Sequence, residues 1–331
     1  MTDIHFISRA DGSRLALTRQ APPRFDRSVL VVHGATFPTS LSAAYRIEGR
    51  SWFDELCAAG FETWGLDFQG FGPSDPFPGT GHATPGDAID AAAQLALALE
   101  FIRRESPAAS LALIAHSWGT APAGLLLSQR PGQVDRAVFY GPIVAAESRQ
   151  ALPGQTPAFL EVTREAQWAA FTAGVPEGTE PPVTHAEFDR WAEAYLRSDS
   201  RAVPSVRVPS GPAIDIERAR RGHMPYDPGL IETPTLVVRG SWDAVTTEAD
   251  SIRFFHALTR SRGKQLSWIS GGTHRMHLER SRFELFSAVE GFLEKRRLSA
   301  SGVRTRPPAS RAASPRTRRS TRRRAPPGTS S

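Results

Sequence analysis

An apolar run that begins at Leu111 ends at Ser117, a serine with a small residue two positions before it and another two positions after it. The run continues to Ala115 and His116, and Ser117 lies two positions from both Ala115 and Gly119. A sharp turn from a strand into a helix needs small residues at those two positions, because larger ones would collide with the returning helix. The pattern therefore predicts a serine nucleophile, although an ordinary turn with a surface serine has the same short signature.

A serine hydroxyl becomes a good nucleophile when a histidine takes its proton and a carboxylate orients that histidine. Asp243 follows an apolar run at 235–240, and His274 follows a glycine-rich turn 31 residues later. We expect His274 to be the base and Asp243 to fix its tautomer. Two alternatives stand beside these assignments: Asp243 as a turn-capping residue and His277 as the base.

Alternating strands and helices are predicted to position these residues. Strand-like apolar runs lie at 29–32, 61–68, 111–116, 137–140, 235–240 and 265–269, and helical patterns lie at 51–60, 84–102, 121–129 and 282–295. This alternation predicts a mostly parallel, doubly wound α/β sheet. Two earlier runs, at 4–7 and 15–17, flank the turn Asp11-Gly12 and predict an antiparallel start. The carboxyl ends of parallel strands share one edge, where distant loops can build a site.

The alternation stops between residues 145 and 233. No apolar strand is evident there, only helical stretches at 157–171 and 185–196. A structureless connection of that length is uncommon inside a compact domain. We therefore expect a helical cap at 145–233, inserted into a core domain of residues 1–144 and 234–297. Its aromatic residues, together with one from the core, are candidates for substrate binding: Trp168, Phe171, Trp191, Tyr195 and Phe37.

In the order of these elements the chain resembles the α/β-hydrolase superfamily, over residues 1–297. The matching segments are His33-Gly34-Ala35, residues 65–75 with the pattern G-x-D-x-x-G-x-G-x-S, the elbow at 115–119, Gly240–Asp243 and Gly271–Glu279. The family uses the chain order serine, acid, histidine. One departure is Ala115, which replaces the first glycine of the G-x-S-x-G motif. The resemblance implies an oxyanion hole formed by the backbone N–H groups of Ala35 and Trp118.

The expected function is that of a serine hydrolase that cleaves a small-to-medium ester or related acyl compound through an acyl-serine intermediate. Four other enzyme classes use a similar triad and remain alternatives: carbon-carbon bond hydrolases, thioesterases, lactonases and proline-iminopeptidase-like peptidases. A catalytically weak ligand-binding protein on the same scaffold is a further alternative. A serine at the elbow argues against epoxide hydrolases and haloalkane dehalogenases, whose nucleophile is an aspartate. His33 and His116 are expected to pack near the site, and Asp67 to tie down its glycine-rich turn.

The composition sets further limits. The chain has 331 residues, of which 40% are hydrophobic and 22% are charged. Cys57 is the only cysteine, which excludes an intramolecular disulfide and cysteine-based metal clusters. The remaining histidines, including His82, lack metal-site spacing, so we expect no metal and no cofactor. Because no apolar stretch is long enough to span a bilayer, we expect a cytoplasmic protein with a small acyl substrate, of open oligomeric state.

The C-terminal residues 298–331 carry nine arginines and no acidic residue, and they turn a body of net charge −3 into a chain of +6. This segment is rich in proline, serine, threonine and alanine and has no apolar periodicity. We therefore expect it to be disordered. Its charge could bind polyanions weakly, but no specific nucleic acid is expected as a partner.

Overall fold

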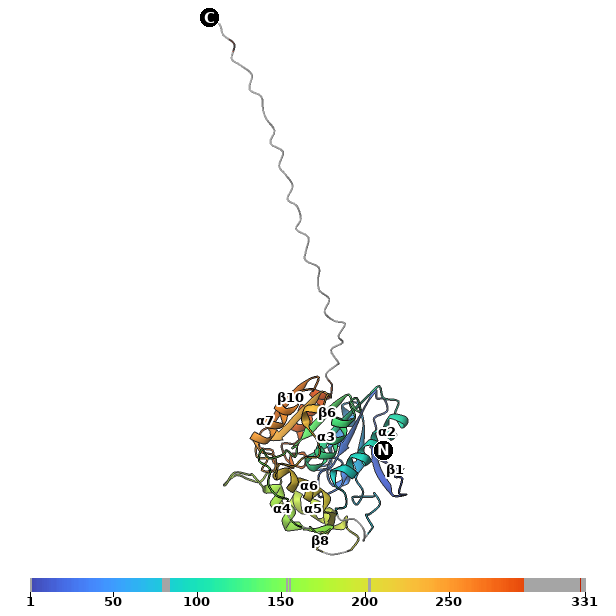
Figure 1. Ribbon diagram of the computed structural model, residues 1–331, viewed down its shortest axis with the longest axis vertical. Coiled ribbons are helices and arrows are strands. Elements are labelled where there is room, and N and C mark those ends of the chain that lie inside the picture. Colours follow the sequence, from blue (N-terminus) through green and yellow to red (C-terminus); the bar gives the residue numbers. More distant parts are fainter. Residues whose placement is uncertain are drawn as a thin grey trace. The chain divides into compact units, whose positions relative to one another are not determined.

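A mixed eight-stranded sheet forms the centre of the computed structural model (Figure 1). The structure describes residues 2–78, 84–152, 154, 156–201, 204–294 and 328. The strand order is β1-β2-β4-β3-β5-β6-β9-β10, and the pairs β1–β2 and β2–β4 are antiparallel whereas the other pairs are parallel. The strands are β1 (Thr2–Ser8), β2 (Arg14–Gln20), β3 (Arg27–Val32), β4 (Phe61–Asp67), β5 (Ser110–His116), β6 (Arg136–Tyr140), β9 (Thr235–Gly240) and β10 (Lys264–Ile269). The predicted parallel sheet with an antiparallel start is confirmed.

Helices cover both faces of this sheet. Alternate residues of β3 enter two apolar clusters: Val29 packs with Phe53 and Phe286, whereas Leu30 packs with residues of the opposite face. Strands covered on both faces are apolar throughout, which is why they read as continuous runs in the sequence. The helices on the first face are α1 (Trp52–Ala58) and α8 (Arg282–Leu293), and those on the other are α2 (Ala88–Glu105), α3 (Thr120–Gln129) and α7 (Glu248–Ala257). Four short 3-10 helices complete the list: η1 (Thr39–Leu41), η2 (Ser117–Gly119), η3 (Pro228–Leu230) and η4 (Met276–Leu278).

The start of α2 differs from the sequence prediction, in which the helical pattern begins at residue 84. The N-cap is Asp87, whose side chain accepts a hydrogen bond from the backbone N–H of Asp90. Gly86 just before it has φ of 73°, a left-handed conformation that cannot belong to a helix. Residues 84–86 therefore form a turn, and the helix begins after it.

Residues 145–233, hereafter the insertion, contain strands that the sequence analysis did not anticipate. The strands β7 (Phe159–Thr163) and β8 (Ser205–Pro209) pair antiparallel, so the expectation of an all-helical cap is wrong. The expected helix at 157–171 is also wrong in its first part, because Thr163 caps the helix that follows. About forty residues separate the two strands in the sequence, which removes the local hairpin signal. The helices here are α4 (Arg164–Thr172), α5 (His185–Arg197) and α6 (Gly211–Arg220), the last of which was not predicted.

Side chains attach the insertion to the core. The Trp191 indole N–H donates to the carbonyl oxygen of Leu41 at 2.9 Å. Asp215 of α6 accepts hydrogen bonds from the backbone N–H of Ala88 and from the Trp118 indole N–H, at 2.7 and 3.0 Å. Asp215 thus joins the insertion both to the start of α2 and to the residue that follows Ser117.

Some expectations concern residues outside the described ranges. These are His82 and, apart from Gly328, the C-terminal segment 298–331 with its expected disorder. The division into a core domain and a cap domain stays a prediction. Within the described residues, the helices are too short or too polar to cross a lipid bilayer.

Candidate active site

The sequence around Ser117 folds into a sharp turn between β5 and α3. Ser117 has φ of 54°, one of only two non-glycine residues with positive φ in the described chain. Such a conformation carries strain that the surrounding structure must hold, and it is common at functional sites. A Cβ atom on Gly119 would lie 2.5 Å from the carbonyl oxygen of His33, so only glycine fits there. Ala115 is fully buried at the end of β5, where a small side chain is accommodated.

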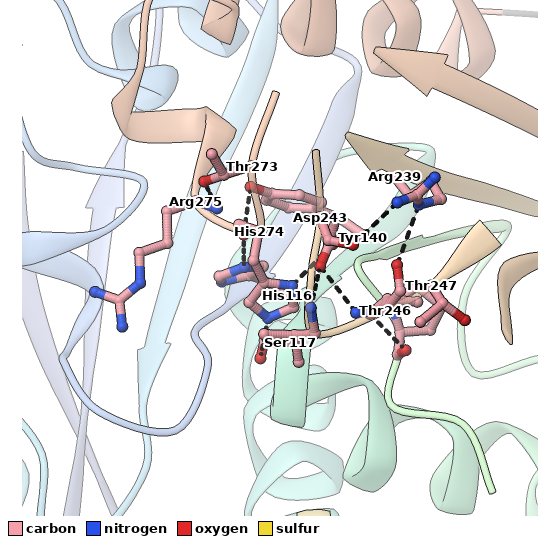
Figure 2. Close-up of polar contacts among 12 residues, drawn as sticks. His116, Ser117, Tyr140, Arg239, Asp243, Thr246, Thr247, Thr273, His274 and Arg275 are labelled. Atoms are coloured by element: carbon pink, nitrogen blue, oxygen red, sulfur yellow. Dashed lines mark hydrogen bonds and ion pairs between the residues drawn. The ribbon is translucent and has the colours of Figure 1, made fainter. Parts of the chain in front are cut away.

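Ser117, His274 and Asp243 come together at the carboxyl edge of the sheet (Figure 2). The Ser117 Oγ lies 2.7 Å from the Nε2 atom of His274. On the other side of the ring, the His274 Nδ1 lies 2.9 Å from the Oδ2 atom of Asp243. All three residues are buried, with exposed fractions of 7%, 8% and 3%. The three residues singled out from separate motifs therefore form one continuous hydrogen-bonded chain.

The loop after β9 fixes the Asp243 carboxylate. Its Oδ1 accepts the backbone N–H groups of Val245 and Thr246, both at 2.8 Å. The buried Arg239 guanidinium donates to the carbonyl oxygens of Asp243 and Thr246, which holds the loop around the carboxylate. Burial alone would raise the pKa of Asp243, but the His274 interaction and these two N–H groups lower it below its ordinary value. Asp243 is therefore an ionised acceptor beside the imidazole, in addition to ordering its own turn.

Two glycines shape the same edge: Gly141, which the sequence analysis did not single out, and Gly240, the first residue of the segment that carries Asp243. A Cβ atom on Gly141, which has φ of 55°, would lie 2.9 Å from the His274 Cε1 and 3.0 Å from its Nδ1. A Cβ atom on Gly240 would lie 1.9 Å from the carbonyl oxygen of Gly272. The loop of Asp243 and the loop of His274 are thus in direct backbone contact. The position of Gly141 directly after β6 was the available sequence signal.

The structure brings His274, and not His277, to the serine. His277 contacts the Ser42 Oγ and the Tyr140 hydroxyl, each at 3.1 Å. Burial, aided by the nearby charges of Arg275 and His274, lowers the pKa of His277 to about 3, so this ring is neutral. His277 therefore packs beside the site and makes no contact with Ser117, as expected for the histidine that was not favoured as the base.

Other polar residues hold the histidine loop in place. His116 and the Tyr140 hydroxyl both hydrogen-bond to the carbonyl oxygen of His274, at 2.9 and 3.0 Å. Glu279 accepts hydrogen bonds from the backbone N–H and the hydroxyl of Thr273. Burial raises the pKa of Glu279 to about 7. The roles of Tyr140 and Thr273 were not anticipated: Tyr140 ends a predicted strand, and Thr273 lies in the histidine segment without a chemical signature of its own.

Ala35 and Trp118 border the serine from two sides. A Cβ atom on Gly34 would lie 3.1 Å from the Ser117 Cβ, so the peptide preceding Ala35 adjoins the serine side chain. Trp118 follows Ser117 directly, at the start of η2. In the described part of the chain, the backbone N–H groups of these two residues donate none of the hydrogen bonds that the protein makes. Both donors are therefore available near the serine.

The predicted substrate-binding aromatics occupy different environments. Phe171, Trp191 and Tyr195 are almost fully buried, and the Trp191 ring lies 5.1 Å from that of Phe37, across the boundary between insertion and core. Trp168 instead stacks on His185 at 4.4 Å, within the insertion. The structure thus brings the first three together with Phe37 in one apolar cluster, and the half-buried Trp168 packs against the same cluster from its edge.

The remaining expectations near the site are met in part. The His33 Nε2 accepts the backbone N–H of Phe68, and its ring packs against Phe71, so it is a structural residue. The Asp67 side chain accepts the backbone N–H of Thr39, and a Cβ atom on Gly72 would lie 2.4 Å from its Oδ2 atom, so Asp67 contacts both the loop of Thr39 and the glycine-rich turn that follows it. No group of three or more His, Cys, Asp and Glu residues in the described ranges is arranged to hold a metal ion.

Comparisons with known proteins agree with this fold. The sequence pattern of the family described as serine aminopeptidase, S33, matches residues 24–281. No curated protein sequence matches the chain. Among solved structures, the chain is similar to the esterase EaEST from Exiguobacterium antarcticum, with 16% identity, TM-score 0.60, and coverage of 88% of this chain and 99% of that one.

Two further structures resemble the chain to the same degree. One is the serine hydrolase CarC, involved in carbazole degradation, with 16% identity, TM-score 0.61, and coverage of 89% and 100%. The other is the thioesterase domain from the curacin biosynthetic pathway, with 16% identity, TM-score 0.59, and coverage of 89% and 100%. At these identities the likeness concerns the fold.

Proposed function

This chain belongs to the serine aminopeptidase, S33, family of α/β-hydrolases, and from that premise we propose that it cleaves a small-to-medium ester or a related acyl compound. It is a serine hydrolase of that superfamily; the bond and the catalytic residues are what we propose. The observation that carries the proposal is the hydrogen-bonded chain from Ser117 through His274 to Asp243, with distances of 2.7 and 2.9 Å.

In the first half of the proposed reaction, the Ser117 Oγ attacks the substrate carbonyl carbon while the His274 Nε2 takes the hydroxyl proton. The Asp243 carboxylate keeps the Nδ1 proton of His274 in place and stabilises the imidazolium that forms, without taking that proton. His274 then gives its Nε2 proton to the departing alkoxide as the bond to the acyl carbon breaks. An alcohol leaves, and the acyl group stays on Ser117.

In the second half, a water molecule attacks the acyl-serine carbonyl. His274 takes a proton from the water and returns it to the Ser117 Oγ when the acyl bond breaks, which releases the acid. Each half passes through a tetrahedral oxyanion. The N–H groups of Ala35 and Trp118 are its proposed donors, and one such donor is typically worth about 3 kcal/mol of barrier.

The charge near the site favours an ester over a peptide with a free amino terminus. An aminopeptidase must bind an α-ammonium group, for which a free carboxylate is the usual partner. Asp215 and Glu279 already accept hydrogen bonds from protein groups, and the residue after His274 is a buried cation, Arg275. We therefore rank aminopeptidase activity second to ester hydrolysis.

An active-site-directed probe tests whether Ser117 is activated. A fluorophosphonate should label the wild-type protein, and Ser117→Ala should abolish that labelling. Ser128→Ala is the matched control, because Ser128 lies on α3 and donates only to the carbonyl oxygen of Leu125. Unlabelled wild-type protein would favour the ligand-binding alternative.

A substrate panel then tests the bond type. We expect p-nitrophenyl esters to turn over faster than lactones, thioesters and amino-acid amides, with every activity absent in Ser117→Ala. A preference for lactones, thioesters or amides would replace the ester proposal by the corresponding alternative.

A further inference from the structure

A buried cation beside the hydrogen-bonded triad has no acidic partner. Arg275 directly follows His274 and is 8% exposed. Its guanidinium donates a hydrogen bond to the carbonyl oxygen of the Gln167 side chain, and no carboxylate of the described residues forms an ion pair with it. Glu279 lies near enough to act on its charge, but the Glu279 oxygens are bound to Thr273. Burying a charge without a paired counter-ion costs free energy of folding, so we expect this arginine to serve a function.

Aromatic rings surround this guanidinium. It lies over the ring of Phe37 at 5.1 Å and over the ring of Phe171 at 4.8 Å. Ring faces attract a cation, but they do not replace the strong hydrogen bonds that its N–H edges can make. An acceptor with two oxygens in the guanidinium plane would use those edges.

Two more buried polar groups lie in the same place. The Tyr195 hydroxyl and the Gln167 amide nitrogen are buried, make no hydrogen bond of good geometry, and lie close enough to interact with each other. Burial raises the pKa of the Tyr195 hydroxyl to about 12, and the neighbouring Gln167 side chain and the Arg275 charge act against that rise. The three groups are thus close together, and each offers an N–H or O–H at neutral pH.

Their position suits a part of the substrate beyond the scissile bond. Phe37 lies two residues after Ala35, whereas Gln167, Phe171 and Tyr195 belong to the insertion. Figure 2 shows the Arg275 side chain on the opposite side of His274 from Asp243. The cluster therefore lies between the segment that adjoins Ser117 and the insertion.

We propose that Arg275, Gln167 and Tyr195 form a subsite for a carboxylate of the substrate, so that the preferred substrates are acyl compounds that carry a second, ionised carboxyl group. This inference rests on the proposed hydrolase function and specifies its substrate class. A carboxylate would give Arg275 its missing counter-ion and accept from the Gln167 amide and the Tyr195 hydroxyl.

The test compares p-nitrophenyl monoesters of succinic, glutaric and adipic acids with the esters of the matched monocarboxylic acids. A parallel pair carries the free carboxylate on the alcohol side. The wild-type protein should show a higher kcat/KM for the carboxylated member of at least one pair. Equal rates within every pair would overturn the subsite, whereas no hydrolysis and no fluorophosphonate labelling would overturn the proposed function instead.

Two variants then assign the preference to this cluster. Arg275→Met removes the charge but keeps an unbranched apolar side chain, and Gln167→Glu supplies an internal carboxylate while leaving Arg275 between its rings. Each should lower the ratio of kcat/KM for carboxylated over neutral esters roughly 10- to 100-fold, as expected for the loss of hydrogen bonds to a charged group.

A matched control separates this effect from overall charge. Arg280→Met removes an exposed arginine that pairs only with Glu180 and should leave the ratio unchanged. Should Arg275→Met fail to fold, Gln167→Glu decides alone. An unchanged ratio in folded Gln167→Glu would mean that Arg275 is a structural cation.

Discussion

The carboxyl edge of the large sheet and the insertion contribute to the site in different ways. At the edge, backbone meets backbone: side chains on Gly119 or Gly240 would collide with the carbonyl oxygens of His33 or Gly272. The insertion is attached by side chains, such as Trp191 on Leu41 and Asp215 on Trp118. It also has backbone contacts, because the Gly211 N–H donates to the Pro85 carbonyl oxygen and a Cβ atom on Gly174 would lie 2.0 Å from the carbonyl oxygen of Trp242. The difference teaches that the loops of the proposed triad are fixed by backbone contacts that leave little room for change, whereas the proposed substrate subsite is built from side chains.

The largest expected effect lies at the edge. Replacing Ser117 or His274 with alanine should lower kcat roughly 10⁴- to 10⁶-fold, and Asp243→Ala should lower it somewhat less, because the residual rate depends on the other groups of the unit. Steady-state ester hydrolysis and circular dichroism would measure activity and folding separately.

His277→Ala is the control for the identity of the base. It should retain far more activity than His274→Ala, because His277 contacts Ser42 and Tyr140 and not Ser117. Full activity in His274→Ala combined with loss in His277→Ala would contradict the assignment.

The next effect tests whether the edge tolerates even one methyl group. Gly141→Ala should lower kcat about 10²- to 10³-fold, because the new Cβ would press on the His274 ring and displace it. Gly132→Ala imposes the same backbone strain, with φ of 79°, but its Cβ would meet nothing within 4 Å. Similar kcat values for the two variants would show that strain, and not contact with the histidine, matters.

The sequence predicted the edge well because its constraints are local. The parallel sheet with its antiparallel start follows from short apolar patterns, and the family and fold class are confirmed. The serine elbow and the choice of His274 over His277 also follow from short patterns, and their catalytic roles stay predictions. Gly141 was missed because its neighbours come from loops about a hundred and more residues away. The same holds for Asp215, whose partners Ala88 and Trp118 lie in the first half of the chain.

Glu279 provides a pH test of the edge. Its pKa is about 7 in the folded protein, against about 4.3 in an unfolded chain. The folded state therefore binds this proton more tightly than the unfolded chain does. Its contribution to the free energy of unfolding is fully present below pH 4 and is lost as the pH rises through 7.

Relative to Glu279→Gln, the unfolding free energy of the wild-type protein should fall by about 3 kcal/mol between pH 4 and pH 8. Urea unfolding of both proteins at several pH values measures this difference. A difference that does not change with pH would mean that Glu279 does not titrate in this range.

The smallest predicted effect concerns the attachment of the insertion. Asp215→Ala should lower the unfolding free energy by about 2 kcal/mol, because two buried N–H donors lose their acceptor, partly offset by removal of a buried carboxylate. Asp227→Ala, in an exposed turn, should change it by less than about 1 kcal/mol. Equal effects of the two variants in urea unfolding at pH 7 would show that Asp215 does not stabilise the attachment of the insertion.

The insertion was harder to predict for a physical reason. Its strands β7 and β8 pair across a long segment and are partly exposed, so neither a turn signal nor a continuous apolar run marks them. The aromatic residues Phe171, Trp191 and Tyr195 were identified, but Arg275 was not. Its role depends on which groups surround its guanidinium, and only the folded chain reveals them.

The backbone contact between Gly240 and Gly272 has a consequence for how such a protein can diversify. Because the two loops touch without intervening side chains, neither can gain bulk or length at that point without displacing the other. We therefore expect new specificity to be easier to acquire by exchanging part of the insertion, residues 145–233, than by remodelling the loops. In a recombination library, chimaeras that swap this segment should inherit the donor's substrate range while keeping the recipient's chemistry.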